Sequence, residues 1–149
     1  AGSDRSLKVW KTATGELLRS LAAHTEAIHS IAVRPRSSPS ENQPAVCATG
    51  GQDRTLRVWQ PSIGRMVRIV RGHDGPVFAV AWTRDGNAVL TAGQEGIVRR
   101  VDADSDAILD RWHWHRDWIY SIAVHPDGSR VATGDWSGTV QVHRLDEPR

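Results

Sequence analysis

Residues 48–59, ATGGQDRTLRVW, contain the pattern from which the rest of the chain can be laid out. Its closest counterpart is residues 2–10, GSDRSLKVW, where an Asp and a Trp again stand six residues apart. Weaker counterparts follow at intervals of forty-two residues, first as Thr91, Glu95 and Val101, and then as Thr133, Ser137 and His143. The chain therefore repeats one unit along its length.

The period of the repeat predicts the architecture. Self-similarity at about 40–45 residues, with several short strands in each unit, is typical of propeller blades. Runs of β-branched and apolar residues between turn residues predict thirteen strands, at 6–10, 16–21, 28–33, 45–49, 55–59, 66–70, 77–82, 88–92, 97–101, 107–112, 119–124, 130–134 and 139–143. We therefore expect an all-β protein of about three and a quarter four-stranded blades: a half blade (1–22), two blades (23–71 and 72–113) and an incomplete blade (114–149).

This number of blades is small, because closed propellers have about 4–8 blades. Three explanations are open: a piece of a longer propeller, a ring completed by identical chains, or a strained four-bladed monomer closed by the N-terminal strands. We favour the first, because the chain begins and ends inside repeats. Open blades expose apolar faces and strand edges, which favour association.

Composition narrows the functional classes. The chain has 149 residues, of which 39% are hydrophobic and 24% charged, as in ordinary globular proteins. Its net charge of +2 comes from scattered Lys and Arg, which argues against nucleic acid as a partner. Cys47 is the single cysteine, and no apolar run approaches the length of a membrane span. We expect a cytoplasmic protein that requires no cofactor and contacts no membrane.

The repeated residues resemble those of the WD-repeat β-propeller family. A Gly-His pair stands at Gly72 and His73, while His24 and His115 occupy the same position in the neighbouring units. Trp59 ends its unit, although the Asp that gives the family its name does not follow it. The combined spacing of His, Thr, Asp and Trp is more specific than any single dipeptide, and the resemblance covers essentially the whole chain.

The resemblance implies a structural tetrad, in which a His, a Thr, an Asp and a Trp form a hydrogen-bonded chain inside one blade. The matching residues are His24, Thr49, Asp53 and Trp59. A His-Asp-hydroxyl set could also be catalytic. We favour the structural role, because a hydroxyl on an internal strand of a packed blade is poorly accessible to a substrate.

The two later units depart from this pattern. Glu95 and Val101 replace the acid and the indole in one, which predicts a shortened network. Ser137 and His143 replace them in the other, which requires a different polar pairing. We expect packing to contribute more than hydrogen bonds to these two blades.

The resemblance also implies a partner-binding face, formed by the start of each innermost strand and by the residue before the Asp position. Its residues are Ala27, His29 and Gln52 in the first full unit, Pro76, Phe78 and Gln94 in the next, and Trp118, Tyr120 and Trp136 in the last. Large aromatic residues in one unit suggest a binding hot spot. Alternatively, the rings pack on one another or on a missing blade.

The segment 111–118, RWHWHRDW, raises two further possibilities. His113 and His115, with His143, could contribute to a metal or catalytic site, but no local set of carboxylates or thiols completes it. The rings could also stack on nucleic-acid bases, although a supporting basic stripe is not evident. The sequence thus favours a non-enzymatic scaffold for protein or peptide partners, with a metal-binding or catalytic propeller as the alternative.

Overall fold

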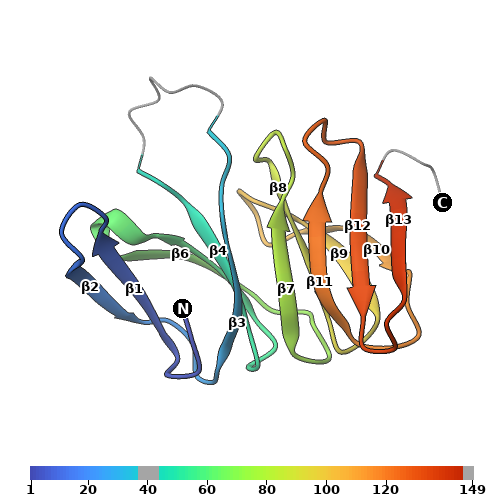
Figure 1. The fold of residues 1–149 in the computed structure, drawn as a ribbon, viewed down its shortest axis with the longest axis horizontal. Helices are drawn as coiled ribbons and strands as arrows, with labels where there is room; N and C mark the ends of the chain where they lie inside the picture. Colours follow the sequence, from blue (N-terminus) through green and yellow to red (C-terminus); the bar gives the residue numbers. More distant parts are fainter. Residues whose placement is uncertain (37–43, 146–149) are drawn as a thin grey trace.

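The computed structural model describes residues 1–36 and 44–145, and it confirms the all-β fold (Figure 1). Its described part contains thirteen strands in four antiparallel sheets. The first sheet has β1 (Ser6–Lys11) and β2 (Glu16–Ala22). The second has β3 (Ile28–Val33), β4 (Cys47–Gly51), β5 (Leu56–Gln60) and β6 (Arg65–Val70), with a short 3-10 turn, η1 (Pro61–Ile63), before β6. The third has β7 (Val77–Trp82), β8 (Ala88–Gly93), β9 (Ile97–Asp102) and β10 (Ile108–His113). The fourth has β11 (Ile119–Val124), β12 (Arg130–Asp135) and β13 (Val140–Arg144).

The sheets stand side by side as an arc of propeller blades. Each is a meander, and the first strands of the last three sheets, β3, β7 and β11, are neighbours (Figure 1). The β1–β2 hairpin lies at one end of the arc and β13 at the other. Within the described residues the hairpin forms its own sheet and is not paired with β13. The N-terminal strands therefore do not complete the last blade, and a four-bladed closed monomer is not formed.

Adjacent blades are joined by apolar packing and by polar contacts. The core between the second and third sheets includes Leu56, Val70 and Val77. The backbone N–H of Val80 donates to Ser30 Oγ at 3.1 Å, and Trp82 Nε1 donates to the carbonyl of Ala32 at 3.0 Å. The third sheet has a neighbour on each face, so β8 is buried along its whole length and lacks an alternation of polar and apolar residues.

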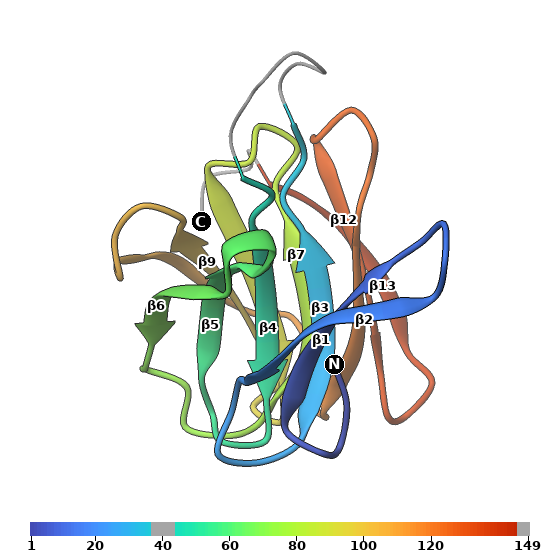
Figure 2. The same cartoon turned by 90° about the vertical axis from the view of Figure 1, so that its left-hand side faces the viewer.

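The β1–β2 hairpin covers one face of the second sheet (Figure 2). Leu7 and Ala23 pack there against Ile28, Cys47 and Trp59. Burial in this cluster raises the pKa of the Cys47 thiol to about 11. No helix in the described part of the chain is long and apolar enough to cross a bilayer.

Candidate protein-interaction surface

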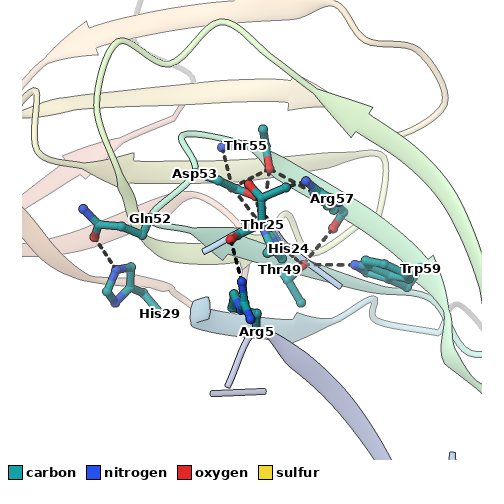
Figure 3. Close-up of polar contacts among 10 residues, drawn as sticks. All are labelled: Arg5, His24, Thr25, His29, Thr49, Gln52, Asp53, Thr55, Arg57 and Trp59. Carbon is teal, nitrogen blue, oxygen red and sulfur yellow. Dashed lines mark hydrogen bonds and ion pairs between the residues drawn. The ribbon is translucent and has the colours of Figure 1, made fainter. Parts of the chain in front are cut away.

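The second sheet contains the most complete polar network, shown in Figure 3. Trp59 Nε1 donates to Thr49 Oγ1 at 3.0 Å, and Thr49 Oγ1 lies 2.7 Å from His24 Nε2. His24 Nδ1 is 2.9 and 3.0 Å from the two carboxylate oxygens of Asp53. An ionised carboxylate can only accept, so we assign the proton to Nδ1, and Nε2 then accepts from the threonine. One directed chain of hydrogen bonds thus connects β4 and β5 with the turn between them and with the segment that precedes β3.

Asp53 is held as a carboxylate. Burial favours its neutral form, but hydrogen bonds from His24, Thr55 and the backbone N–H of Thr25 outweigh this effect and keep the pKa of Asp53 well below its usual range. Arg57 Nη2 lies 3.0 Å from the same carboxylate. The pKa of His24 is lowered, because burial outweighs the attraction of Asp53 for the proton. The network therefore contains a neutral His and an ionised Asp at neutral pH.

The third sheet has a shorter network. His73 Nε2 lies 2.8 Å from Thr91 Oγ1, but His73 Nδ1 has no hydrogen-bond partner among the described residues. Glu95 forms a bidentate pair with Arg99 instead, with both N–O distances at 2.6 Å. Burial, together with the positive charges of Arg99 and Arg111, lowers the pKa of His73 to about 4.

In the fourth sheet the acid is present but displaced by two residues. His115 Nδ1 is 2.7 Å from Asp135 Oδ2, and His115 Nε2 is 2.7 Å from Thr133 Oγ1. Ser137 and the backbone of Thr139 donate to Asp135 Oδ1 at 2.7 and 2.9 Å. The different polar pairing that the sequence requires in this unit is therefore confirmed for the His115 network. Asp135 supplies the carboxylate that the repeat spacing places at residue 137.

The remaining position of that network has changed its role. His143 stands where the repeat spacing places the indole, but its ring stacks on Trp114, with centroids 4.0 Å apart. His143 Nε2 lies 2.9 Å from Gln141 Oε1. The ring is thus held by the neighbouring aromatic side chain and by β13 itself.

The expected partner-binding positions lie at one end of the sheets, at the lower edge of Figure 1. We call this end the loop face: the turns that precede β3, β7 and β11 and the turns between the second and third strands of the same sheets. One backbone hydrogen bond recurs in the second, third and fourth sheets. The N–H of Gln52 donates to Ala27 at 2.8 Å, that of Gln94 to Pro76 at 3.1 Å, and that of Trp136 to Trp118 at 2.9 Å. The backbone therefore presents equivalent side chains in each of these sheets, and sequence differences alone change the surface.

Four large rings from two adjacent sheets meet on the loop face, and we call them the aromatic cluster: Phe78, Trp118, Tyr120 and Trp136. The rings of Phe78 and Tyr120, the only Phe and Tyr in the sequence, are stacked with centroids 4.6 Å apart and an interplanar angle of 7°. Trp118 lies 6.0 Å from Phe78, and Trp136 lies 5.7 Å from Tyr120. The stacking does not bury the cluster, since Trp118, Tyr120 and Trp136 are 41, 42 and 73% exposed.

A polar region adjoins the cluster. The ring of His29 meets Phe78 edge to face at 5.0 Å, and His29 Nε2 lies 2.8 Å from Gln52 Oε1 (Figure 3). Gln52 also lines an open polar depression of about 560 Å³. Gln94 and Pro76 line the same depression. The sequence-predicted face residues thus form an aromatic region over the third and fourth sheets and a polar region over the second and third.

The histidines of segment 111–118 do not gather around a common point. Both ring nitrogens of His115 take part in the buried network with Asp135 and Thr133. His113 is exposed on β10. Among the described residues, no three side chains with metal-binding groups are clustered.

Asp135 is the residue that sequence reasoning missed at this end of the molecule. The position equivalent to Asp135 is Gly51 in the second sheet and Gly93 in the third. A Cβ at Gly51 would lie 2.5 Å from His24 Nδ1, so this position points at the histidine ring. The available signal in the sequence was an acid at a position where the other two units have glycine. The sequence alone does not show that a side chain at this position points toward the histidine ring.

Comparisons with known proteins agree with this architecture. The family model described as "WD domain, G-beta repeat" matches residues 15–60, 64–102 and 108–144. Each match contains the outermost strand of one sheet and the first three strands of the next. A 71-residue part of the chain is 31% identical to the WD repeat-containing protein 26 homolog of Arabidopsis thaliana, and the match covers 48% of this chain and 12% of that protein. The three matches to the family model cover most of the 149-residue chain, and the chain therefore belongs to the WD40 repeat family.

Proposed function

We propose that this protein is a non-enzymatic scaffold whose protein or peptide partner contacts the aromatic cluster on the loop face. WD40 repeats point generally to protein-interaction scaffolds. The observation that carries the specific proposal is that the four rings contact one another while Trp118, Tyr120 and Trp136 remain exposed.

The energetics of interfaces favour such a surface. Trp and Tyr bury a large area with few rotatable bonds, and they are enriched among the residues that dominate binding energy. Rings that already stack in the free protein lose less side-chain freedom when a partner binds than isolated rings would. The cluster is thus both large and preorganised, while His29, Gln52 and Gln94 extend it with groups that can form hydrogen bonds.

The alternative, a metal-binding or catalytic propeller that uses His113 and His115, receives less support. His115 would have to leave Asp135 or Thr133 before a ring nitrogen could bind a metal or act as a base. This exchange would expose a buried carboxylate or hydroxyl without its partner, which is costly.

Exposed apolar side chains on the sheets of the arc indicate a second kind of partner. Val33 on β3 is 66% exposed, and Val140 and Val142 on β13 are 73 and 62% exposed. Exposed apolar side chains on sheets favour association. We propose that further blades cover these faces, from the parent chain or from identical chains. The mass of the protein in solution separates a monomer from an assembly of identical chains.

Comparative affinity purification tests the aromatic cluster. Trp118, Tyr120 and Trp136 are replaced together by Ala, and the proteins captured are compared with those captured by the unaltered protein. Trp10→Ala and Leu109→Ala serve as controls, because both side chains are about half exposed but lie outside the cluster. We expect partners to be lost from the triple variant alone. An unchanged partner set with a folded triple variant would show that this surface is not the contact site.

A further inference from the structure

The two tryptophans of the aromatic cluster are each preceded by a carboxylate. Asp117 precedes Trp118 and Asp135 precedes Trp136, and the backbone hydrogen bond between the two tryptophans brings these dipeptides together. At the equivalent positions, the second sheet has Glu26 and Gly51. The combination of two acids and two indoles is thus specific to the fourth sheet, within a face whose backbone is otherwise repeated.

Both carboxylates are held in place by their turns. Asp117 Oδ1 accepts the backbone N–H of Trp118 at 2.8 Å. Asp135 is almost fully buried, with a side chain 4% exposed, and it accepts from His115 and Ser137. Hydrogen bonds from Ser137 and His115 lower the pKa of Asp135 to about 2. The two carboxylates are therefore fixed next to the tryptophans in sequence, one by the backbone of Trp118 and one by His115 and Ser137.

Two positive charges near this surface are exposed, Arg116 and, in the adjoining polar depression, Arg54. Among the described residues, the cation–π contact is that of Arg34 over Trp82. Both residues lie at the C-terminal ends of their strands, β3 and β7, away from the loop face. Arg57 is paired with Asp53, and Arg99 with Glu95. Arg116 is exposed next to Asp117 and partly offsets its charge. The net effect at the tryptophan pair is an electron-rich aromatic surface with two carboxylates and one exposed cation.

We infer that Trp118 and Trp136, with Tyr120 between them, bind a positively charged side chain of a linear peptide. This inference rests on the proposed function, since it names the chemistry of the partner at the same surface. A cation over the face of an indole is attracted by the ring quadrupole, and Trp is the most effective of the aromatic residues. Asp117 adds a charge–charge attraction, and the polar depression beyond Gln52 and Gln94 accommodates the flanking peptide backbone.

A matched peptide pair isolates the charge. The probes are short Gly-Ser peptides of equal length with trimethyl-lysine at the centre, or with its neutral isostere in which carbon replaces the ammonium nitrogen. An arginine peptide and a glutamate peptide complete the set. Binding to the full chain is followed through the indole N–H signals in NMR. We expect the trimethyl-lysine peptide to bind about tenfold more tightly than its isostere, with the Trp118 and Trp136 signals shifting.

Variants outside the proposed binding surface provide the controls. Trp136→Ala should weaken binding of the trimethyl-lysine peptide about tenfold, whereas Trp10→Ala, an exposed tryptophan on β1, should leave it unchanged. Asp117→Asn should weaken binding about threefold, and Asp106→Asn, an exposed acid in the turn between β9 and β10, should not.

Equal binding of the two matched peptides, or no binding of either up to about 1 mM, would overturn the inference. The proposed function fails separately, if the triple aromatic variant keeps its captured partners. If the triple variant loses a captured partner while the probe peptides bind equally whatever their charge, the interaction surface is supported and a cationic ligand is excluded.

Discussion

His115 Nδ1 lies 2.7 Å from Asp135 Oδ2, whereas the equivalent histidine, His24, contacts Asp53, which stands two residues later in its own repeat. The same interaction is therefore made from two backbone positions. Asp135 is the last residue of β12, and its equivalent, Gly51, has no room for a side chain while Asp53 occupies the site. One blade therefore has room for an acid at only one of these two positions.

This relationship predicts a rescue. Asp135→Gly should lower the thermal midpoint, because His115 Nδ1 loses its acceptor while remaining buried. Asp135→Gly combined with Ser137→Asp should recover most of the loss, since it reproduces the arrangement of Gly51 and Asp53. Ser137→Asp alone should not stabilise the protein, because Asp135 already occupies the position. Equal midpoints for the single Gly variant and the double variant would show that the two acid positions are not interchangeable.

The hydroxyls of Thr49 and Thr91 should differ in their contribution to stability. Thr49 Oγ1 bonds to both His24 and Trp59, whereas Thr91 Oγ1 bonds to His73 and the repeat has Val101 in place of the indole. Thr49→Val should therefore lower the free energy of unfolding by about 2–3 kcal/mol, and Thr91→Val by about 1 kcal/mol. Urea denaturation of the two variants measures the difference. Equal losses would mean that the indole bond contributes nothing.

The Glu95–Arg99 pair should tolerate joint replacement better than single replacement. Arg99 is 2% exposed, so Glu95→Ala leaves a buried positive charge without its partner. We expect this variant to lose about 3–5 kcal/mol of stability. Glu95→Leu with Arg99→Met removes both charges and should lose less. A double variant less stable than Glu95→Ala would contradict this account.

Stability should fall in two separate ranges of pH. The pKa of His73 is lowered from 6.5 to about 4, mainly by burial, so the unfolded chain binds its proton more readily. Stability therefore decreases as the pH falls from 6.5 towards 4, and the lowered pKa of His24 acts in the same direction. The pKa of Asp135 is lowered from 3.8 to about 2, so its contribution is lost below pH 3.8.

His73→Gln separates these ranges. The amide can still bond to Thr91 but does not titrate, so the loss between pH 6.5 and 4 should become smaller while the loss at lower pH remains. Urea midpoints measured at several pH values provide the readout. An identical pH profile for the variant and the unaltered protein would exclude His73 as the titrating group.

Cys47 should be inert in the folded protein. Burial raises the pKa of its thiol to about 11, and the side chain packs against Leu7 and Trp59. A thiol-specific disulfide reagent at pH 8 should therefore react slowly with the folded chain and rapidly in denaturant, because the thiolate is the reactive form. Fast reaction without denaturant would indicate that the β1–β2 hairpin opens readily.

The repeat spacing was sufficient to predict the strands and their grouping, because each blade is a local meander whose turns lie close in sequence. The joining of His24, Thr49, Asp53 and Trp59 is likewise as the resemblance implies. The displaced acid at Asp135 was not predicted, since a fixed interval of forty-two residues assumes that each role keeps its position. Nor could spacing decide whether the aromatic rings stack, bury one another or remain open.

The sequence by itself thus determined the repeat and the all-β architecture, and its resemblance to the family implied which residues share the loop face. Only the tertiary structure showed that Phe78, from the third sheet, stacks on Tyr120, from the fourth, while Trp136 remains 73% exposed. The physical reason is that hydrogen bonding along the chain sets the strands within a blade, whereas the contacts between blades depend on how neighbouring side chains pack. The candidate interaction surface is formed by side-chain packing between blades.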